Sequence, residues 1–483
     1  METSSPKSRL YFAVIVAASV TIVLGQGLSR LSEAPAGRDS WRQTDSLMVG
    51  RNFCRESAPL FEPKIDARRN TDGTTGMEFP VLNYIAGRAA CVGFDHIVAA
   101  PLLSLLFMAT ALAALFAVAH SLSSRRAATL AIGLYAAAPL TVYYCVSIQP
   151  DVPAVALALT AIAFLLKAPL QPSYLWLSAL CWAAAILIKL PVIVFGLVPL
   201  HVFMKQGARK SLRDWRMWMF GAIALVPPMA WYLHARRLQR ASGLDHFYLG
   251  KGLPELARDW VDPSFYAGVF GQLFDVTAFP VVSLVAVAVA LTRYTTLPDV
   301  LKAMVISVLC FWFLAGGHAA HHYYYGLLVT PVLALVAAFG LDQLVENTTG
   351  RWRRPFRILV GVVLVPLAMT HALIRTAHWV PADKKLGRIA ELRKHLDRLD
   401  STRSAVALYS NNNPTLLWFM DRKGWLLPHD EPPPTELEWS LIDRRALGAE
   451  RDEEVQHLLE AVPLTREYCN RLGCLFRKTS ISQ

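Results

Sequence analysis

An uncharged apolar run limits the fold of this chain more than any other feature. Residues 97–120, IVAAPLLSLLFMATALAALFAVAH, contain no Asp, Glu, Lys or Arg over 24 residues. As an α-helix the run is about 36 Å long, which exceeds the roughly 30 Å hydrocarbon core of a bilayer. The 483-residue chain is also only 17% charged, whereas soluble chains carry about 25% charged residues. These features predict an α-helical polytopic membrane protein.

Further apolar segments predict about eleven transmembrane helices in total. The predicted spans are 10–28, 97–120, 127–145, 152–166, 174–188, 190–204, 217–233, 268–292, 300–316, 325–341 and 356–374. A cleaved signal peptide is an alternative for the first span, because Lys7 and Arg9 precede its apolar run. Two spans are favoured over one for 174–204, with a tight outer turn at Lys189-Leu190-Pro191, because this choice keeps the basic loops on one side.

The distribution of lysine and arginine sets the expected orientation. Basic residues gather in the stretches 205–216, 293–302 and 351–357, whereas the turns 145–151 and 317–324 contain no lysine or arginine. Cytoplasmic loops of membrane proteins carry the excess of positive charge. We therefore expect the N-terminus to lie in the cytoplasm.

This topology predicts two domains. The first, 1–379, is a transmembrane domain with a long outer loop at 29–96 and a second outer loop near 234–267. The second, 380–483, has soluble composition, an amphipathic helical pattern at 384–399 and then the alternating sequence SAVALYS. We expect it to be a small extracytoplasmic α/β domain.

Cysteine spacing gives no sign of a cysteine metal site, and the placement of charge argues against nucleic-acid binding. Most of the seven cysteines are scattered, without the spacing of metal ligands. Cys469 and Cys474 are close enough to form a disulfide if the tail is extracytoplasmic, and otherwise they stay reduced. The net charge of +12 does not indicate nucleic-acid binding, because its placement follows the membrane topology.

Unusual polar residues collect on the outer side of this topology. They are Asp39 and Asp45 in GRDSWRQTDS, Asp66, Glu78, Asp151, Lys189, Arg236 and Arg237 in HARRLQR, and His318, His322, Tyr323 and Tyr324 in HAAHHYYY. Carboxylates together with Arg, Lys and His suit a general base that faces a phosphate-bearing substrate.

Purely structural roles are the alternative for most of these residues. Arg42 lies three residues from both Asp39 and Asp45, so the three could form a salt-bridge ladder on a helix surface. The two aspartates are about 240° apart around a helix, so they reach one point only if the helix begins between them. Asp151 could simply cap a helix, and Lys189 could extend its amine to the membrane interface.

The histidine–tyrosine segment also has several interpretations. His318 and His322 are four residues apart, a helical spacing that would suit a zinc ion. Donation from imidazole and tyrosine hydroxyl groups to a phosphate is the second interpretation. A belt of interfacial aromatic residues explains the three tyrosines without a functional role.

Several short motifs resemble the GT-C glycosyltransferases. They are an acidic first outer loop, E-x-P at Glu78, P-D at Asp151, and an H-x-x-Y element from His322 that ends at Pro331. The most similar branch contains protein O-mannosyltransferases and bacterial aminoarabinose-lipid A transferases. WRQTDSLMVGRNF and NNNPTLLWFMDRKGW resemble uncharacterised bacterial members of that branch.

The resemblance implies a GT-C fold and transfer of a sugar, with inversion, from a polyprenyl-phosphate carrier to an acceptor hydroxyl. It implies that Asp39 or Asp45 is the base, that Asp151 orients the acceptor or a divalent cation such as Mg or Mn, and that Glu78 and Gln43 give support. Donor phosphate binding would fall to Arg42, Lys189, Arg236, Arg237, His318, His322, Tyr323 and Tyr324. Two departures are that the family's Asp-Glu pair falls near Arg42 and Gln43, and that Phe79 replaces a lysine.

The resemblance also implies a location and partners. The protein would lie in the bacterial inner membrane with a periplasmic site and a periplasmic C-terminal domain, and would act on a lipid, glycan or protein acceptor. A transporter or flippase of lipid-linked sugars is the main alternative, and a non-catalytic protein of envelope assembly is another. A transporter gains nothing from acidic residues concentrated on one side.

Overall fold

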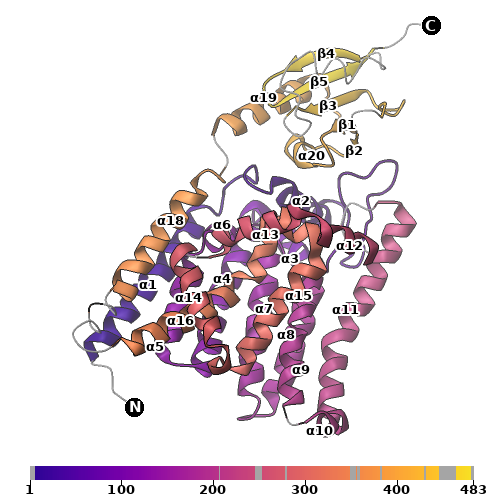
Figure 1. Ribbon diagram of the computed structural model, residues 1–483. Coiled ribbons are helices and arrows are strands. Elements are labelled where there is room, and N and C mark those ends of the chain that lie inside the picture. The colour runs from indigo at the N-terminus through magenta and orange to yellow at the C-terminus, as the bar shows by residue number, and fades with distance from the viewer. Residues whose placement is uncertain are drawn as a thin grey trace. The chain divides into compact units, whose positions relative to one another are not determined.

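The computed structural model describes residues 6–205, 207–244, 253–277, 280–348, 355, 359–380, 383–428, 431–444 and 464–479. The chain divides into two units (Figure 1). The helical unit comprises Met1–Leu31, Pro101–Leu233 and Leu249–His378. The loop–tail unit comprises Ser32–Ala100, His234–Tyr248 and Trp379–Gln483.

Helices lie across every predicted span, apart from the undescribed residues 278–279 and 356–358. The helices are α1 (Pro6–Ser29), α4 (His96–Leu122), α5 (Arg125–Ala136), α6 (Pro139–Tyr144), α7 (Asp151–Lys167), α8 (Ser173–Ile188), η1 (Leu190–Gly196), α9 (Leu197–Met204), α10 (Ala208–Arg213), α11 (Trp215–Ser242), α12 (Leu253–Val261), α13 (Pro263–Val276), α14 (Pro280–Thr292), η2 (Tyr294–Thr296), α15 (Asp299–His321), η3 (Tyr323–Leu328), α16 (Thr330–Asn347), η5 (Leu359–Leu364) and α18 (Val365–Ala377). The basic stretch 351–357 lies outside the described residues except for residue 355.

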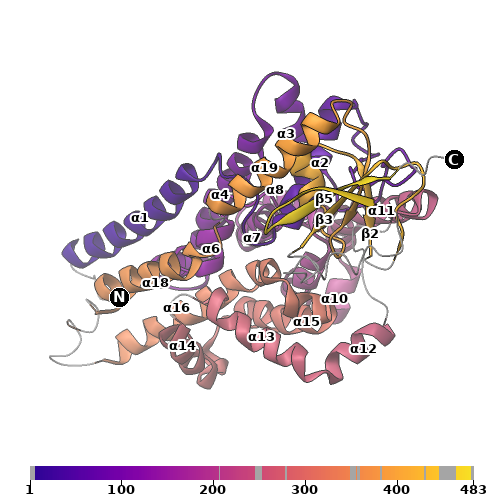
Figure 2. The same cartoon turned by 90° about the horizontal axis from the view of Figure 1, so that it is seen from above.

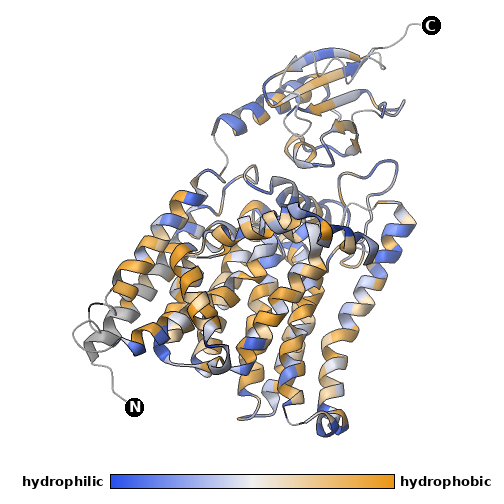
Figure 3. Ribbon diagram, in the orientation of Figure 1, coloured by the Kyte–Doolittle hydropathy of each residue, from blue (hydrophilic) through white to orange (hydrophobic). Residues whose placement is uncertain are grey.

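The helices of this unit are predominantly apolar (Figure 3). Among the described residues, α4 and α15 are long and apolar enough to cross a membrane, and the bent pair α13 and α14 would be a third such span. The helices in the other predicted spans are too short, or not apolar enough over their described residues, to meet both conditions. The α-helical fold class predicted from the apolar runs is confirmed.

A break at Lys189 divides the long segment 174–204 as predicted. Helix α8 ends at Ile188, and Lys189 is extended with φ −150° and ψ 102° before η1 begins. A proline at position 191 cannot donate the backbone hydrogen bond that a continued helix needs there. Helices α7 and α8 pack together, and α15 packs against η1 and α9.

The segment 234–267, predicted as an outer loop, is largely helical in the structure. Residues 234–242 continue α11, and α12 and α13 occupy much of the remainder. The sequence HARRLQR is rich in residues that favour helices, so the helix extends until Gly243. At that glycine φ is 65°, which is typical of a residue that terminates a helix.

The loop–tail unit combines three segments that are distant in sequence. It contains α2 (Ser40–Arg55), α3 (Val81–Cys91), α19 (Asp383–Leu399), α20 (Thr415–Met420), β1 (Val406–Tyr409), β2 (Gly424–Leu427), β3 (Trp439–Asp443), β4 (Leu464–Cys469) and β5 (Gly473–Lys478). The strand order is β2-β1-β3-β5-β4, with β1 parallel to β2 and β3, and β5 antiparallel to β3 and β4. Seen from above, α19 lies beside this sheet (Figure 2).

The first loop shares its hydrophobic core with the tail. Phe53 from α2 belongs to the same buried cluster as Leu392 from α19 and Leu408 from β1. This packing groups residues 32–100 and 234–248 with the tail, whereas the sequence prediction assigned them to the domain 1–379. All four residues of β1 are buried, because β1 lies between two strands and is covered on both faces.

Both disulfides lie in the loop–tail unit. Cys469–Cys474 links the paired ends of β4 and β5, which is one of the two predicted alternatives. Cys54–Cys91 links the ends of α2 and α3 and was not anticipated. The two helices approach closely where Gly87 leaves no room for a Cβ beside the Gly50 carbonyl.

Candidate functional site

A buried ion pair lies at one end of the helical unit. Asp151 is the first residue of α7 and is fully buried, and Lys189 follows α8 and is 3% exposed. Lys189 Nζ lies 3.3 Å from Asp151 Oδ1. The prediction that Lys189 extends its amine to the membrane interface therefore does not describe its environment, because the amine is paired inside the protein.

Aromatic rings cover the ammonium group of Lys189. Its Nζ lies 5.1 Å from the ring centre of Tyr324 and 4.8 Å from that of Tyr325, within the range of a cation–π interaction. His322 stacks on Tyr324 with ring centres 5.4 Å apart, and His318 lies 5.7 Å from His322. The structure thus gathers residues from α7, the α8–η1 junction, α15 and η3.

The two candidate bases of the first loop have different environments. Asp39 is half-buried, has a left-handed backbone with φ 50°, and immediately precedes α2, which begins at Ser40. Asp45 lies inside α2 and is fully buried. Asp39 lies before the first residue of α2 and Asp45 lies inside it. The angle of about 240° expected for two residues of one helix therefore does not apply to this pair.

Arg42 and Gln43 make contacts within the loop–tail unit. Arg42 is 4% exposed and donates to Glu78 Oε1 at 2.6 Å. Gln43 Nε2 donates to the carbonyl of Arg38 at 3.2 Å. The pair with Glu78 joins α2 to the segment before α3, which is a tertiary contact that a ladder confined to one helix does not make.

The basic end of α11 lies against the same segment. Arg236 and Arg237 are exposed on the last turns of α11. On the same turns Gln239 Nε2 donates to the Gly76 carbonyl at 3.1 Å. A His234 ring nitrogen also lies 2.9 Å from the Phe61 carbonyl. This end of α11 is therefore fixed to the first loop two residues before Glu78.

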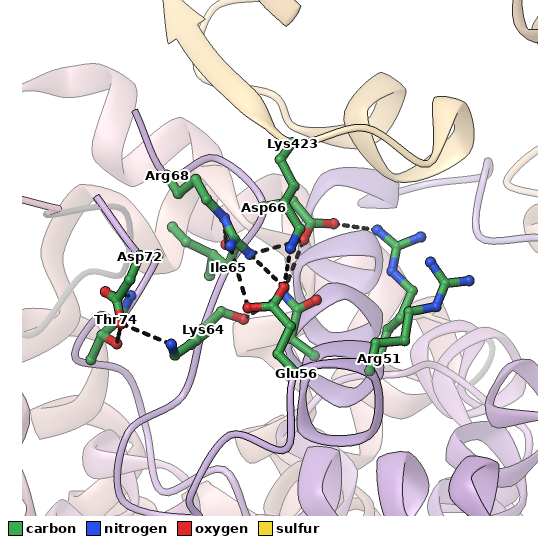
Figure 4. A network of polar contacts seen from close by, with 12 residues as sticks. Arg51, Glu56, Lys64, Ile65, Asp66, Arg68, Asp72, Thr74 and Lys423 are labelled. Atoms are coloured by element: carbon green, nitrogen blue, oxygen red, sulfur yellow. Dashed lines mark hydrogen bonds and ion pairs between the residues drawn. The ribbon is translucent and has the colours of Figure 1, made fainter. Parts of the chain in front are cut away.

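A second group of buried charges joins α2 to the tail. Arg51 donates to Asp66 and, at 2.6 Å, to Asp421, and Asn52 Nδ2 donates to Asp66 at 2.9 Å. Nearby, Arg68 and Lys423 donate to Glu56 (Figure 4). We call Arg51, Asp66 and Asp421, with the residues that contact them, the Arg51 cluster.

The backbone of the first loop continues the sheet next to the Arg51 cluster. Ala67 forms a parallel bridge with Gly424 of β2, and Gly424 N–H donates to the Asp66 carbonyl at 2.9 Å. Farther along the loop, Lys64 beside Asp72 lowers the pKa of that carboxyl to about 2. Figure 4 shows the pair of Lys64 and Asp72 beside the contacts of Glu56 and Asp66.

The described residues contain no arrangement of side chains typical of a metal site. Among the described residues, no group of three or more His, Cys, Asp or Glu side chains is arranged to hold a metal ion. His318 and His322 lie near each other, but their rings are tilted by 36° and sit beside tyrosines. The geometry of this segment is that of an aromatic and imidazole cluster.

Comparison with known proteins identifies the fold. Residues 77–234 match the family model for dolichyl-phosphate-mannose-protein mannosyltransferase. The structure resembles ArnT from Cupriavidus metallidurans bound to undecaprenyl phosphate, with a TM-score of 0.62, 12% identity and 99% of both chains covered. The chain has the GT-C fold. The resemblance predicted from the motifs is confirmed.

Other solved structures share this GT-C fold. The archaeal oligosaccharyltransferase AglB from Archaeoglobus fulgidus, in complex with an inhibitory peptide and a dolichol-phosphate, has a TM-score of 0.62 at 10% identity, with 97% of this chain and 74% of AglB covered. The arabinofuranosyltransferase AftD from Mycobacteria has a TM-score of 0.57 at 14% identity, with 98% of this chain and 40% of AftD covered. The curated proteins contain no significant match to this chain.

The sequence identified most residues that the structure gathers, but it missed their partners. The family-model match includes Glu78, Asp151 and Lys189 and begins after α2. Tyr325 is the tyrosine of the H-x-x-Y element but was not assigned to phosphate binding, although its ring centre lies nearer to the Lys189 amine than that of Tyr324. Arg51 and Asp421 lie in the quoted motifs WRQTDSLMVGRNF and NNNPTLLWFMDRKGW, but neither was singled out as a site residue, since 370 residues separate them.

Proposed function

We propose that this chain is a glycosyltransferase of the bacterial inner membrane. It moves a sugar from a polyprenyl-phosphate carrier to an acceptor hydroxyl on the periplasmic face. Support comes from the GT-C fold shared with ArnT bound to undecaprenyl phosphate and with AglB in complex with a dolichol-phosphate. The mannosyltransferase family model that matches residues 77–234 supports the same class of donor.

The buried Lys189 is the observation that carries this proposal. A cation surrounded by tyrosine rings and away from water interacts with a phosphate more strongly than a solvated one. The adjacent carboxylate of Asp151 holds the amine in place and balances its charge. His318, His322 and the hydroxyl groups of Tyr323 and Tyr324 are further candidate donors to the phosphate.

A first-loop aspartate acts as the base in the proposed reaction. The acceptor hydroxyl gives its proton to this carboxylate, and its oxygen forms a bond to the anomeric carbon. The bond from that carbon to the phosphate oxygen breaks with inversion, and polyprenyl phosphate leaves with the electron pair. Half-buried Asp39 is better placed to meet an acceptor than fully buried Asp45.

Arg42, Arg236 and Arg237 are secondary candidates for phosphate binding. Arg42 already pairs with Glu78, so its first role is to hold the segment before α3 against α2. Arg236 and Arg237 are exposed and charged, which suits a contact with a lipid phosphate at the membrane surface. Glu78 and Gln43 support the first loop, and a divalent cation is not required for this assignment.

The test is the replacement of each aspartate by asparagine. The full chain is purified into lipid nanodiscs and supplied with a pool of polyprenyl-phosphate sugars, and the release of polyprenyl phosphate is measured. Removal of a general base lowers turnover by about 10²–10⁴-fold, so Asp39→Asn or Asp45→Asn should show this loss. Asp72→Asn is the matched control, because Asp72 is an exposed acid of the same loop.

Two results would contradict the proposal. Full turnover in both Asp39→Asn and Asp45→Asn would overturn the assignment of the base. Movement of the lipid-linked sugar across vesicle membranes without its cleavage would replace the transferase by a transporter. Loss of turnover in Asp72→Asn as well would mean that any change in the loop is disruptive.

A further inference from the structure

Helix α15 is interrupted by two glycines immediately before the histidine–tyrosine segment 318–325. Gly316 has φ 53° and ψ −143°, a backbone conformation that residues other than glycine adopt only with strain. A Cβ at Gly316 would also collide with Asp259 of α12. The direction of the last turn of α15, residues 317–321, is therefore set separately from that of the rest of the helix.

Two residues of α12 satisfy the backbone groups at this break. In an unbroken α-helix the N–H of Gly317 donates to the carbonyl of Phe313, four residues earlier. Here the Gly317 N–H donates to Asp259 Oδ2 at 2.7 Å. The Phe313 carbonyl accepts from Trp260 Nε1 at 2.8 Å. Asp259 and Trp260, which are neighbours in α12, thus bond to the donor and the acceptor that an unbroken α15 would pair with each other.

Packing around these hydrogen bonds holds α12 on α15. The Trp260 ring meets the Phe313 ring edge to face, with ring centres 6.2 Å apart. The hydroxyl of Tyr266 in α13 donates to the Trp260 carbonyl at 2.7 Å. Figures 1 and 2 both show α12, α13 and α15 side by side. The contact is therefore part of the packed structure and is more than a surface hydrogen bond.

Helix α13 holds the far side of the same turn. Gln272 is buried, and its Nε2 donates to the carbonyls of Ala319 and Ala320 at 2.6 and 2.9 Å. Gly268 has no room for a Cβ beside Ala320. The turn 317–321 is thus bound by α12 at its start and by α13 along its length, and it leads directly into His322 and the tyrosines around Lys189.

We propose that Asp259 and Trp260 are positioning residues for the donor phosphate. They do not touch the donor themselves. They keep α15 broken at Gly316, and the broken helix directs His318 and His322 toward the tyrosines that cover Lys189. This inference rests on the proposed function, because it assigns the positioned segment to donor binding. It predicts that changes in α12 weaken donor affinity while the chemical step is retained.

The test compares two substitutions at Asp259. Asp259→Ala removes the acceptor for the Gly317 N–H, whereas Asp259→Asn keeps an oxygen that accepts the same hydrogen bond. Trp260→Phe keeps an aromatic ring and removes the Nε1–H donor. Val261→Ala changes an exposed residue of the same helix and is the matched control. All are made in the full chain in lipid nanodiscs.

Three quantities are measured: the Kd for undecaprenyl phosphate, the KM and kcat with polyprenyl-phosphate sugars, and amide hydrogen exchange over residues 313–325. Asp259→Ala should raise both Kd and KM by about tenfold, an effect typical of the loss of a hydrogen bond to a charged group. Its kcat should stay near that of the wild type, and exchange over 316–322 should accelerate. Trp260→Phe should shift in the same direction by less, and Asp259→Asn and Val261→Ala should resemble the wild type.

Several outcomes would overturn the inference. Wild-type affinity and exchange in Asp259→Ala would show that α12 does not hold the break. A loss in Asp259→Asn as large as in Asp259→Ala would exclude the hydrogen bond as the cause, and a fall in kcat at constant KM would exclude donor positioning. If the wild type fails to bind undecaprenyl phosphate, the proposed function and the donor role both fail, while hydrogen exchange still decides whether α12 holds α15.

Discussion

The Asp151–Lys189 pair of the helical unit and the Arg51 cluster of the loop–tail unit are both withdrawn from water, but they are built differently. The amine of Lys189 lies beside the Asp151 carboxylate and under the rings of Tyr324 and Tyr325. Arg51 has two carboxylates, and one of these, Asp421, also accepts from Arg55 and Arg403. The first group is mainly aromatic, and the second is a network of complementary charges.

Under the proposed function, this difference separates a group that binds the donor phosphate from one that holds the fold together. The tyrosine rings attract the Lys189 ammonium group without adding a negative charge, so in the proposed function a phosphate interacts with it in addition to the Asp151 carboxylate. In the Arg51 cluster each charged group faces partners of the opposite sign, and these come from α2, the first loop and the tail. Such a network fixes three segments in one arrangement. Substitutions that remove both partners distinguish the two cases.

The largest effect is expected at Lys189. Lys189→Met keeps the length of the side chain but leaves the Asp151 carboxylate buried without its cation. Breaking a buried ion pair in this way costs about 3–5 kcal/mol of folding free energy. If Lys189 binds the donor phosphate as proposed, its loss should also lower transfer by about 10²–10³-fold. Thermal unfolding in detergent and the release of polyprenyl phosphate measure the two effects separately.

The double variant Asp151→Asn with Lys189→Met is the control for stability. Because it removes both charges, it should recover most of the lost thermal stability while transfer stays low. Recovery of transfer together with stability would show that the pair is only structural. The comparison between the two buried groups would then fail.

A smaller effect on activity is expected in the Arg51 cluster. Arg51→Met leaves Asp66, which is fully buried, without its main cation, and should lower the unfolding free energy by about 3–5 kcal/mol. The double variant Arg51→Met with Asp66→Asn should recover much of that stability. Transfer should follow stability in both variants, because no residue of the cluster is assigned to the donor or the acceptor.

This assignment would be contradicted if a variant of the cluster lost transfer but kept the stability of the wild type. Such a loss would show that the Arg51 cluster acts on the reaction and not only on the fold. Arg55→Met is the matched control, because Arg55 also binds Asp421 but its side chain is half exposed. Its substitution should cost at most about 1 kcal/mol, as is usual for exposed ion pairs.

Sequence reasoning predicted the members of the helical group because each stands out in its local context. Lys189 interrupts an apolar segment next to a proline, and Asp151 follows a proline at the start of another. A charge in such a segment is costly, so it indicates a special environment. Their pairing was not predicted, since it depends on α7 and α8 lying side by side, which hydropathy does not report.

The Arg51 cluster has no such local signal. Arg51 is one of several charges in a polar helix, and Asp66, although predicted to lie on the outer side, has no local sequence feature that indicates Arg51 or Asp421 as its neighbours. Their meeting depends on packing between Phe53, Leu392 and other residues far apart in the chain. The same limit hid Cys54–Cys91 and the exchange of hydrogen bonds between α12 and α15, whereas Cys469–Cys474 is local enough to be anticipated.

The two disulfides should differ in their contribution to the loop–tail unit. Cys54–Cys91 closes a segment of 37 residues and Cys469–Cys474 one of five. The loop-entropy relation gives about 4 kcal/mol for the longer and about 2 kcal/mol for the shorter. Replacing both cysteines of each pair by serine and measuring thermal unfolding without reductant tests this order. A larger loss for the shorter loop would show that chain entropy does not govern these links.

The smallest expected effect is the pH dependence of the Arg51 cluster. Burial alone would raise the pKa of Asp421, but Arg51, Arg55 and Arg403 beside it hold the pKa below its ordinary value of 3.8. A carboxyl whose pKa is lowered by folding binds protons more readily when unfolded, so it stabilises the fold above the unfolded pKa. That stabilisation should decline as the pH falls from about 4 through the folded-state pKa.

Thermal unfolding of the wild type and of Asp421→Asn between pH 7 and pH 3 isolates this contribution. The difference in unfolding temperature should be constant above pH 5 and shrink as the solution becomes more acidic, because the wild type alone loses the charge of Asp421. A difference that grows on acidification would reverse the sign of the linkage and exclude Asp421 as an ionised member of the network.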